Sequence, residues 1–375
     1  MSLFANDSFL GVDIGSSAIK VVQLRKGRTS PSLVTYGMVE AKGEFLQKNL
    51  SESTERIKEL LKQVLDESKV STNCVSAALP GLAVFTSLIE LPRTKNAKKL
   101  DQIIRWEAKQ YVPIPVSDVI LSWNEVDLNS EGGFTREEKA REEILSIENA
   151  NNNEDSNKKP SEKITLFLTA APKDLVERFR GLFKSVGLNL SSLEVISSAL
   201  VRSLATKEDM NSSLMIVDIG ATDMEISVVS RESLVLNRTV GLGSLDVTKV
   251  IARGLGIEEE RADAFKKDFG IRKEGLSGQI FRVTSVVLNQ MLEEINTTRN
   301  SFEKKYHEVI DKVVLAGGGA KMRGLDEYLS QELGVRVIVG NPWQKIGFPK
   351  ALEGELKTTA PEFASCVGLA MRNII

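Results

Sequence analysis

The sequence predicts an α/β fold of two related lobes that enclose a ligand-binding cleft. Two stretches of the 375-residue chain, residues 10–17 and 215–222, share an apolar strand, Asp-Ile-Gly and two small residues. Each continues into a second β-rich segment and a third strand, so each opens a similar half of the chain. A third motif, Gly317-Gly318-Gly319-Ala320, lies between an apolar strand and a helical pattern. Together these observations indicate two homologous lobes.

Composition narrows the class of protein. Hydrophobic residues make up 42% and charged residues 27% of the chain, as in a globular protein with a sizeable core. The formal charge of -2 argues against a general nucleic-acid binder. The single histidine, His307, argues against a Ser-His-Asp or Cys-His site. Because no apolar run reaches about 18 residues and no secretory signal is recognisable, we expect a cytoplasmic protein.

Strand and helix patterns alternate along both halves. Helical spacing of apolar residues predicts helices, and short β-rich runs bounded by turn residues predict strands. The strands are expected at residues 10–14, 18–24, 33–39, 75–79, 86–91, 119–126, 164–170, 193–196 and 312–316, and the main helices at 51–67, 98–111, 174–185, 198–204 and 324–333. Residues 129–162 interrupt this pattern. That segment is charged and Asn-rich with few apolar residues, and it is predicted to be a disordered loop.

The two Asp-Ile-Gly turns have the residue types of phosphate-binding loops. Gly15 and Gly220 allow a sharp turn and close approach of a ligand. The small residues that follow, Ser16, Ser17, Ala221 and Thr222, leave amide groups free to face phosphate oxygens. Asp13 and Asp218 suit Mg²⁺ held through water, because Mg²⁺ prefers oxygen ligands and keeps several waters. Lys20 can offset phosphate charge.

The glycine-rich turn brings backbone close to a flat or anionic ligand. Gly317, Gly318 and Gly319 stand between a strand and a helix, where amide groups of a helix N-terminus become available. The motif matches neither Gly-x-x-x-x-Gly-Lys-Ser/Thr nor Gly-x-Gly-x-x-Gly. It therefore argues against a P-loop enzyme and against a Rossmann dehydrogenase.

These elements resemble the actin, chaperone and sugar-kinase superfamily, and within it the PilM family of type IV pilus assembly proteins. The resemblance covers nearly the whole chain. Its most specific part is Ile104-Arg105-Trp106-Glu107-Ala108 followed by Tyr111-Val112-Pro113-Ile114-Pro115. Further matching motifs are Ala78-Leu79-Pro80-Gly81, Ile89-Glu90-Leu91-Pro92, Ala170-Ala171-Pro172-Lys173 and Val367-Gly368-Leu369-Ala370.

The resemblance implies an actin-like (ribonuclease H-like) two-lobe ATP-binding fold with a small inserted α+β subdomain, as in PilM and the related division protein FtsA. The first lobe (1A) is expected at residues 1–83 and 172–209. The inserted subdomain (1C) is expected at 84–171, and the second lobe (2A/2B) at 210–375. The C-terminal segment from Ala364 matches the helix that connects the two lobes.

The resemblance also implies the ligand and its site. ATP and Mg²⁺ would lie between the two phosphate loops, with Gly317, Gly318 and Gly319 facing the adenosine. The usual Ala-Glu near the adenosine is here Ala262-Asp263, followed by Lys266. The usual Asp-x-Glu-Pro is here Glu194-Val195-Ile196-Ser197, so Glu194 is the remaining candidate for orienting the attacking water. We therefore expect at most a slow ATPase.

The resemblance implies a role at the cytoplasmic face of the inner membrane. A PilM-like protein captures the N-terminal cytoplasmic tail of a PilN-like membrane protein in a groove between the first lobe and the inserted subdomain. Trp106 and Tyr111 are the candidate groove residues. Other partners would be pilus platform and motor components and further copies in a ring, with membrane contact only through partners. An FtsA-like filament former and a small-molecule kinase of the same superfamily stay open as alternatives.

Overall fold

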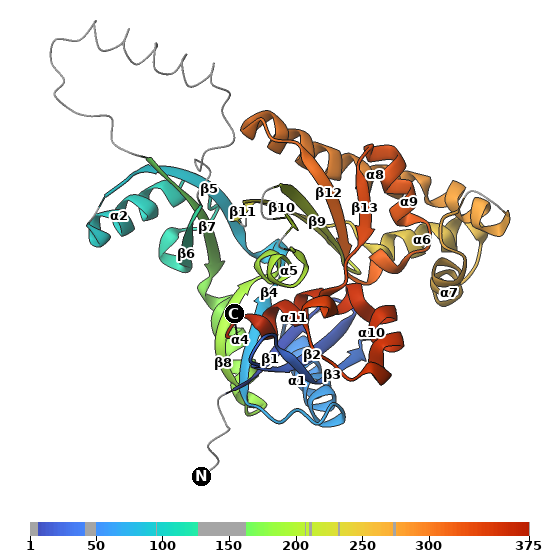
Figure 1. The fold of residues 1–375 in the computed structure, drawn as a ribbon, viewed down its shortest axis with the longest axis horizontal. Coiled ribbons are helices and arrows are strands. Elements are labelled where there is room, and N and C mark those ends of the chain that lie inside the picture. Colours follow the sequence, from blue (N-terminus) through green and yellow to red (C-terminus); the bar gives the residue numbers. More distant parts are fainter. Residues whose placement is uncertain are drawn as a thin grey trace, which may run out of the picture.

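The computed structural model describes residues 7–41, 50–94, 96–126, 163–206, 208–209, 212–231, 233–272 and 275–374. The predicted loop at residues 129–162 lies outside this part of the chain. Three sheets organise the described residues, one in each lobe and one in the inserted segment (Figure 1). The expected actin-like α/β class is confirmed by this architecture.

The first lobe is a five-stranded mixed sheet in the order β3-β2-β1-β4-β8. Its strands are β1 (Ser8–Ile14), β2 (Ala18–Arg25), β3 (Ser32–Glu40), β4 (Cys74–Leu79) and β8 (Asn189–Val195). The helices α1 (Leu50–Glu67) and α4 (Lys173–Ser185) bury apolar side chains against one face, where Leu61 and Phe183 meet Leu10 and Val12. β1 and β2 are buried almost continuously along their length, because both faces of this sheet are covered.

The second lobe repeats this topology in the order β11-β10-β9-β12-β13. Its strands are β9 (Ser213–Ile219), β10 (Met224–Ser230), β11 (Ser233–Val240), β12 (Ile310–Ala316) and β13 (Arg336–Val339). Its helices are α6 (Ser244–Leu255), α7 (Glu259–Phe269), α8 (Gly275–Tyr306) and α9 (Leu325–Leu333). In both lobes three antiparallel strands are followed by two parallel ones, and the Asp-Ile-Gly turn joins the first two strands. The internal repeat seen in the sequence is thus a repeat of structure.

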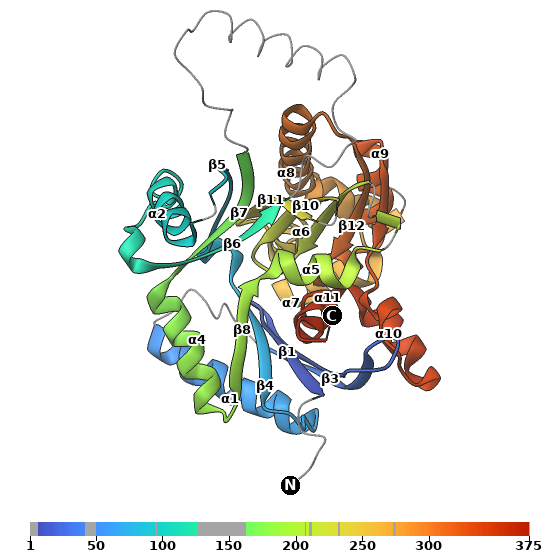
Figure 2. The same ribbon diagram turned by 60° about the vertical axis from the view of Figure 1, so that its left-hand side comes forward.

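The inserted segment forms a small antiparallel sheet in the order β5-β7-β6. It consists of β5 (Phe85–Pro92), α2 (Ala97–Ala108), β6 (Val119–Val126) and β7 (Lys163–Pro172). Ile104 and Ala108 of α2 pack on one face of this sheet. Val126 and Phe167 belong instead to the core of the second lobe, near Leu234 and Leu236 of β11. The inserted segment therefore touches the second lobe as well as the first, as both ribbon views show (Figure 2).

Two crossing helices connect the lobes. These are α5 (Ile196–Leu204), which leads from the first sheet into the second, and α11 (Ala364–Met371), which returns after α10 (Glu353–Thr359). The backbone of Gly368 packs against that of Ala199, so a Cβ atom at Gly368 would lie 1.9 Å from the Ala199 carbonyl oxygen. Residues from Trp343 to Met371 pack on Val22 and Leu24 of the first sheet. This part of the chain was expected in the second lobe, and its apolar side chains are buried against the first.

None of the described helices combines the length and apolar character needed to cross a bilayer.

Candidate functional site

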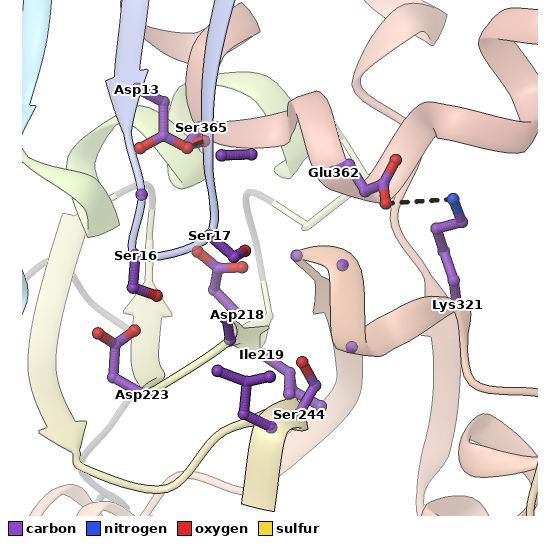
Figure 3. Close-up of a pocket in the computed structure, with 18 of the residues that line it drawn as sticks. Asp13, Ser16, Ser17, Asp218, Ile219, Asp223, Ser244, Lys321, Glu362 and Ser365 are labelled. Atoms are coloured by element: carbon purple, nitrogen blue, oxygen red, sulfur yellow. Dashed lines mark hydrogen bonds and ion pairs between the residues drawn. The ribbon is translucent and has the colours of Figure 1, made fainter. Parts of the chain in front are cut away.

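A cavity of about 480 Å³ lies between the two lobes. Both Asp-Ile-Gly turns and the glycine-rich turn line it (Figure 3). Residues of α7 line it as well. The volume falls in the range of sites for small molecules and cofactors. The cavity thus collects side chains from four separate regions of the sequence.

The first wall is the β1-β2 hairpin. Asp13 at the end of β1 faces Lys20 of β2 in the strand register, and the two charged groups are 3.8 Å apart. Ser365 of α11 donates a hydrogen bond of 2.6 Å to Asp13 Oδ2. The turn itself, with Gly15, Ser16 and Ser17, lines the cavity. The Asp13 carboxylate is therefore held in place from both sides.

The second wall is the β9-β10 hairpin. Asp218 on β9 pairs in register with Glu225 on β10, so both side chains lie on the same face of the sheet. Gly220, Ala221 and Asp223 of the turn also line the cavity. Thr222, predicted as a ligand, is not among the described lining residues, and its hydroxyl lies 3.4 Å from Asp223 Oδ2.

The two turns present backbone donors to the cavity. In the part of the chain that the structure describes, the amide groups of Ser16, Ser17, Ala221 and Thr222 donate to no carbonyl oxygen. Ser16, Ala221 and Thr222 are half-buried and Ser17 is exposed, and successive free amides in a turn suit an anion. Two such turns face each other across one cleft, and this donor set fits a polyphosphate.

The glycine-rich turn closes the cavity beside the second hairpin. Gly317 has a φ angle of 79°, in the region that favours glycine. A Cβ atom there would lie 2.3 Å from Asp218 Oδ1 and 2.4 Å from the Ile219 carbonyl oxygen. Gly318 and Gly319 also line the cavity. Only a residue without a side chain fits at position 317.

The charged residues of α7 are already paired with each other. Lys266 is buried, and its Nζ donates to Thr248 Oγ1 at 2.7 Å and to the Ser244 carbonyl oxygen at 3.1 Å. Asp263 lies 2.7 Å from the ammonium groups of both Lys266 and Lys267. Burial opposes the ionised form of Asp263, but these two hydrogen bonds hold the pKa of its carboxyl below the usual value. Asp263 and Lys266 line the cavity as expected from the sequence, as one connected ion-pair cluster.

The cleft concentrates carboxylates in a poorly solvated space. Burial, with smaller contributions from neighbouring carboxylates, raises the pKa of Asp218 to about 7 and that of Glu225 to about 8. Burial also raises the pKa of Asp223. A polyphosphate would be repelled by these groups when they are ionised. The site therefore fits a polyphosphate that arrives with a divalent cation, which Asp13 and Asp218 would hold through water.

Glu194 has a different environment from the one expected. Its side chain is 6% exposed, lies outside the described cavity lining and accepts hydrogen bonds from Arg202 at 2.8 and 2.9 Å. Arg372, at the end of α11, binds the same carboxylate. Both oxygens are occupied by guanidinium groups, which leaves none to orient a water in the cleft. Ile196, two residues later, is the side chain that reaches the cavity.

Trp106 and Tyr111 are exposed on the inserted segment. Their exposed fractions are 63% and 45%. Trp106 lines a shallow depression with Gln102 and Arg105 of α2 and with Lys109 directly after that helix. Val116 and Ser117 of the following turn complete the lining. No described residue of the first lobe lines this depression, and Tyr111 is not part of it. Both aromatic side chains are thus exposed to a partner, Trp106 in a depression within the inserted segment and Tyr111 outside that depression.

Several cavity residues could not be identified from the sequence. Asp223 was given no role, and Glu225 was read as the first residue of the strand that follows the second turn. Ser365 and Glu362 come from the far C-terminal region, and Lys321 directly follows the glycine-rich motif. Lys321 and Glu362 form an ion pair of 3.1 Å (Figure 3). The signal for Glu225 is its charge in a largely apolar strand, and Asp223 and Lys321 stand next to the second turn and the glycine-rich motif. No local signal marks Ser365 and Glu362.

Comparisons with known proteins agree with this architecture. Among solved structures, the PilM-PilN type IV pilus biogenesis complex superimposes with a TM-score of 0.80 at 24% identity, covering 98% of both chains. MreB 5 of Spiroplasma citri bound to AMPPNP gives a TM-score of 0.53 at 12% identity, covering 97% of this chain and 95% of that one. These likenesses establish the actin-like fold.

Sequence relatives point the same way. Cell division protein FtsA of Streptococcus pneumoniae serotype 2 (strain D39 / NCTC 7466) is 21% identical over 364 residues, covering 90% of this chain and 76% of FtsA. FtsA of Agrobacterium fabrum (strain C58 / ATCC 33970) is 28% identical over 176 residues, 41% of this chain and 38% of that relative's length. The profile of the family described as type IV pilus assembly protein PilM matches residues 11–137 and 151–374. Because this match takes in most of the sequence, the chain belongs to the PilM family of type IV pilus assembly proteins.

Proposed function

We propose that this chain is the cytoplasmic ATP-binding component of a type IV pilus assembly platform. It binds Mg-ATP between its lobes and a short N-terminal peptide of a PilN-like inner-membrane protein on its inserted subdomain. The observation that carries the nucleotide part is the pair of facing turns with free amides, Ser16-Ser17 and Ala221-Thr222. Related solved structures, which include an AMPPNP-bound MreB and a PilM-PilN complex, support the choice of ligand and partner.

The nucleotide would be held from both lobes. The turn amides and Lys20 would bind phosphate oxygens, Asp13 and Asp218 would hold Mg²⁺ through water, and the glycine-rich turn would face the adenosine. The Asp263 and Lys266 cluster lies at the same end of the cavity. Because the ligand contacts both lobes, it favours their closed arrangement by its difference in affinity for the closed and open states.

The partner peptide is proposed to contact the exposed aromatic residues of the inserted subdomain. Trp106 offers a large apolar surface flanked by Arg105 and Lys109. Aromatic residues with neighbouring cations are common among the residues that dominate protein interfaces. We propose subdomain boundaries at residues 84 and 171 for this binding unit, with the first lobe at 1–83 and 172–209. Through this partner, the protein would be located at the cytoplasmic face of the inner membrane.

Titration calorimetry tests both halves of the proposal. The purified chain is titrated with the N-terminal peptide of the PilN-like protein encoded beside it, with and without Mg-ATP. We expect saturable one-to-one binding that Trp106→Ala weakens at least about tenfold. Val286→Ala, at an exposed apolar residue of α8, is the matched control and leaves binding unchanged. Absence of peptide binding in either nucleotide state would reject the partner assignment.

A second titration tests the nucleotide site. Mg-ATP should bind the wild type, and Asp13→Ala should weaken that binding at least about tenfold, because the carboxylate that organises the cation is lost. Asp118→Ala removes a carboxylate from the surface of the inserted subdomain and serves as the control. Equal affinity of Asp13→Ala and wild type would reject the site. Filaments in a sedimentation assay would favour the FtsA-like alternative, and ADP release that depends on a small-molecule acceptor would favour a kinase.

A further inference from the structure

Glu225 has a buried carboxylate oxygen with no hydrogen-bond partner among the described residues. Asp13 is held by Lys20 and Ser365, Asp263 by two lysines, and Glu362 by Lys321. Glu225 is 4% exposed and lines the cavity, and within the described chain its Oε1 has no hydrogen-bond partner. A buried polar atom without a hydrogen-bond partner destabilises the folded state unless a ligand or a water molecule forms a hydrogen bond with it.

Sheet topology places Glu225 at the end of the cleft that is opposite the glycine-rich turn. The second sheet runs in the order β11-β10-β9-β12-β13. The glycine-rich turn follows β12, Asp218 is on β9, and Glu225 is on β10. A nucleotide with its adenosine at Gly317 and its phosphates over Asp218 therefore extends its terminal phosphate toward Glu225.

Among its described residues, the opposite wall at this end has no ionisable side chain. It is formed by Pro80, Gly81 and Ile196, which line the cavity there. A Cβ atom on Gly81 would lie 2.8 Å from Glu225 Oε2, so the carboxylate is packed against backbone on that side. Among these four described residues, Glu225 alone can accept a proton. Water beyond the terminal phosphate would therefore contact Glu225 in a space with little access to solvent.

We propose that Glu225 is the general base of ATP hydrolysis in this protein. The oxygen of a water molecule held by Glu225 Oε1 bonds to the terminal phosphorus of ATP. The bond from that phosphorus to its bridging oxygen breaks, and its electron pair leaves with ADP. The proton of the water passes to the ionised Glu225 carboxylate, a form that the charge of bound Mg²⁺ would favour, and is later released to solvent with phosphate. This inference rests on the proposed function, because it requires Mg-ATP in the cleft.

The experiment compares wild type with Glu225→Gln, which keeps the shape of the side chain and removes its basicity. Single-turnover hydrolysis of Mg-ATP gives the rate of the chemical step, and titration with Mg-AMPPNP gives affinity without turnover. We expect the rate to fall at least about 100-fold, the usual contribution of a general base, with affinity changed by less than about threefold. The melting temperature of each variant reports folding. Glu90→Gln makes the same chemical change on the exposed surface of β5 and should keep the wild-type rate.

Chemical rescue separates a catalytic carboxylate from a structural one. Glu225→Ala leaves a space that formate can enter, and formate should restore part of the lost rate to this variant and none to Glu225→Gln. A rate in Glu225→Gln equal to that of wild type would overturn the inference. A loss of rate in Glu225→Gln that is matched by an equal loss of Mg-AMPPNP affinity would also overturn it. If the wild type does not bind the nucleotide, the proposed function is rejected together with the role of Glu225. If the wild type binds it normally, only the role of Glu225 is rejected.

Discussion

Replacing Glu194 with glutamine distinguishes a structural carboxylate from a catalytic one. The carboxylate joins Arg202 of α5 to Arg372 at the end of α11, the two helices that connect the lobes. Arg202 also donates to the carbonyl oxygen of Gly368 at 2.7 Å, next to the close contact of α11 with α5. Glu194→Gln would therefore weaken the junction of the lobes and leave the cleft unchanged.

The magnitude follows from the exposure of the three side chains. Glu194 is 6% exposed and Arg202 17%, so their pair is a buried one, and breaking a buried pair from one side costs about 3 to 5 kcal/mol. Glutamine keeps one acceptor oxygen, which places the expected loss near the lower limit. Arg372 is 40% exposed, and solvent limits its contribution to about 1 kcal/mol or less. We expect the free energy of unfolding to fall by about 3 kcal/mol.

Urea unfolding followed by circular dichroism measures this change, with single-turnover hydrolysis measured in parallel. Glu177→Gln, which breaks an ion pair between two exposed side chains of α4, should change the free energy of unfolding by less than about 0.5 kcal/mol. The folded fraction of Glu194→Gln should hydrolyse ATP at the wild-type rate. A variant of unchanged stability that has lost hydrolysis would refute this reasoning and return Glu194 to a catalytic role.

Three further results are expected. Without nucleotide or Mg²⁺, the free energy of unfolding should fall by a few kcal/mol between about pH 5 and pH 8. The reason is that Asp218 and Glu225 keep their protons in the folded state up to pKa values of about 7 and 8 but lose them near pH 4 when unfolded. Glu225→Gln should make the free energy of unfolding depend less steeply on pH. A free energy of unfolding that rises over this interval would contradict the prediction. Gly317→Ala should abolish measurable Mg-ATP binding, because its Cβ atom would overlap the Asp218 carboxylate and the Ile219 carbonyl group; unchanged affinity by calorimetry would show that the turn moves freely. Gly81→Ala should favour open lobes, because its Cβ atom would lie 2.6 Å from Thr239 Oγ1 of β11, and an increase in radius of gyration by X-ray scattering measures this; an unchanged radius would count against it.

The sequence by itself determined the elements whose signals are local. The strand, turn and strand around Asp13 and Asp218, and the three glycines from Gly317, could be predicted because a tight turn restricts its own residue types over a few positions. The repeat of that local pattern was enough to predict two similar lobes. The resemblance to the PilM family rested on equally local motifs, such as Arg105-Trp106-Glu107, and is confirmed.

The tertiary structure decided which side chains share the cleft and which leave it. Arg372 reaches Glu194 across 178 residues of sequence, and this contact occupies the carboxylate that the sequence had suggested for water. Glu225 looked like one polar residue of a strand, and only the opposing Gly81 and the strand order show that it lines the cavity. The same holds for Ser365 beside Asp13. Such contacts depend on how distant helices and sheets pack, and the residue types at each position carry no information about a partner that is far away in the chain.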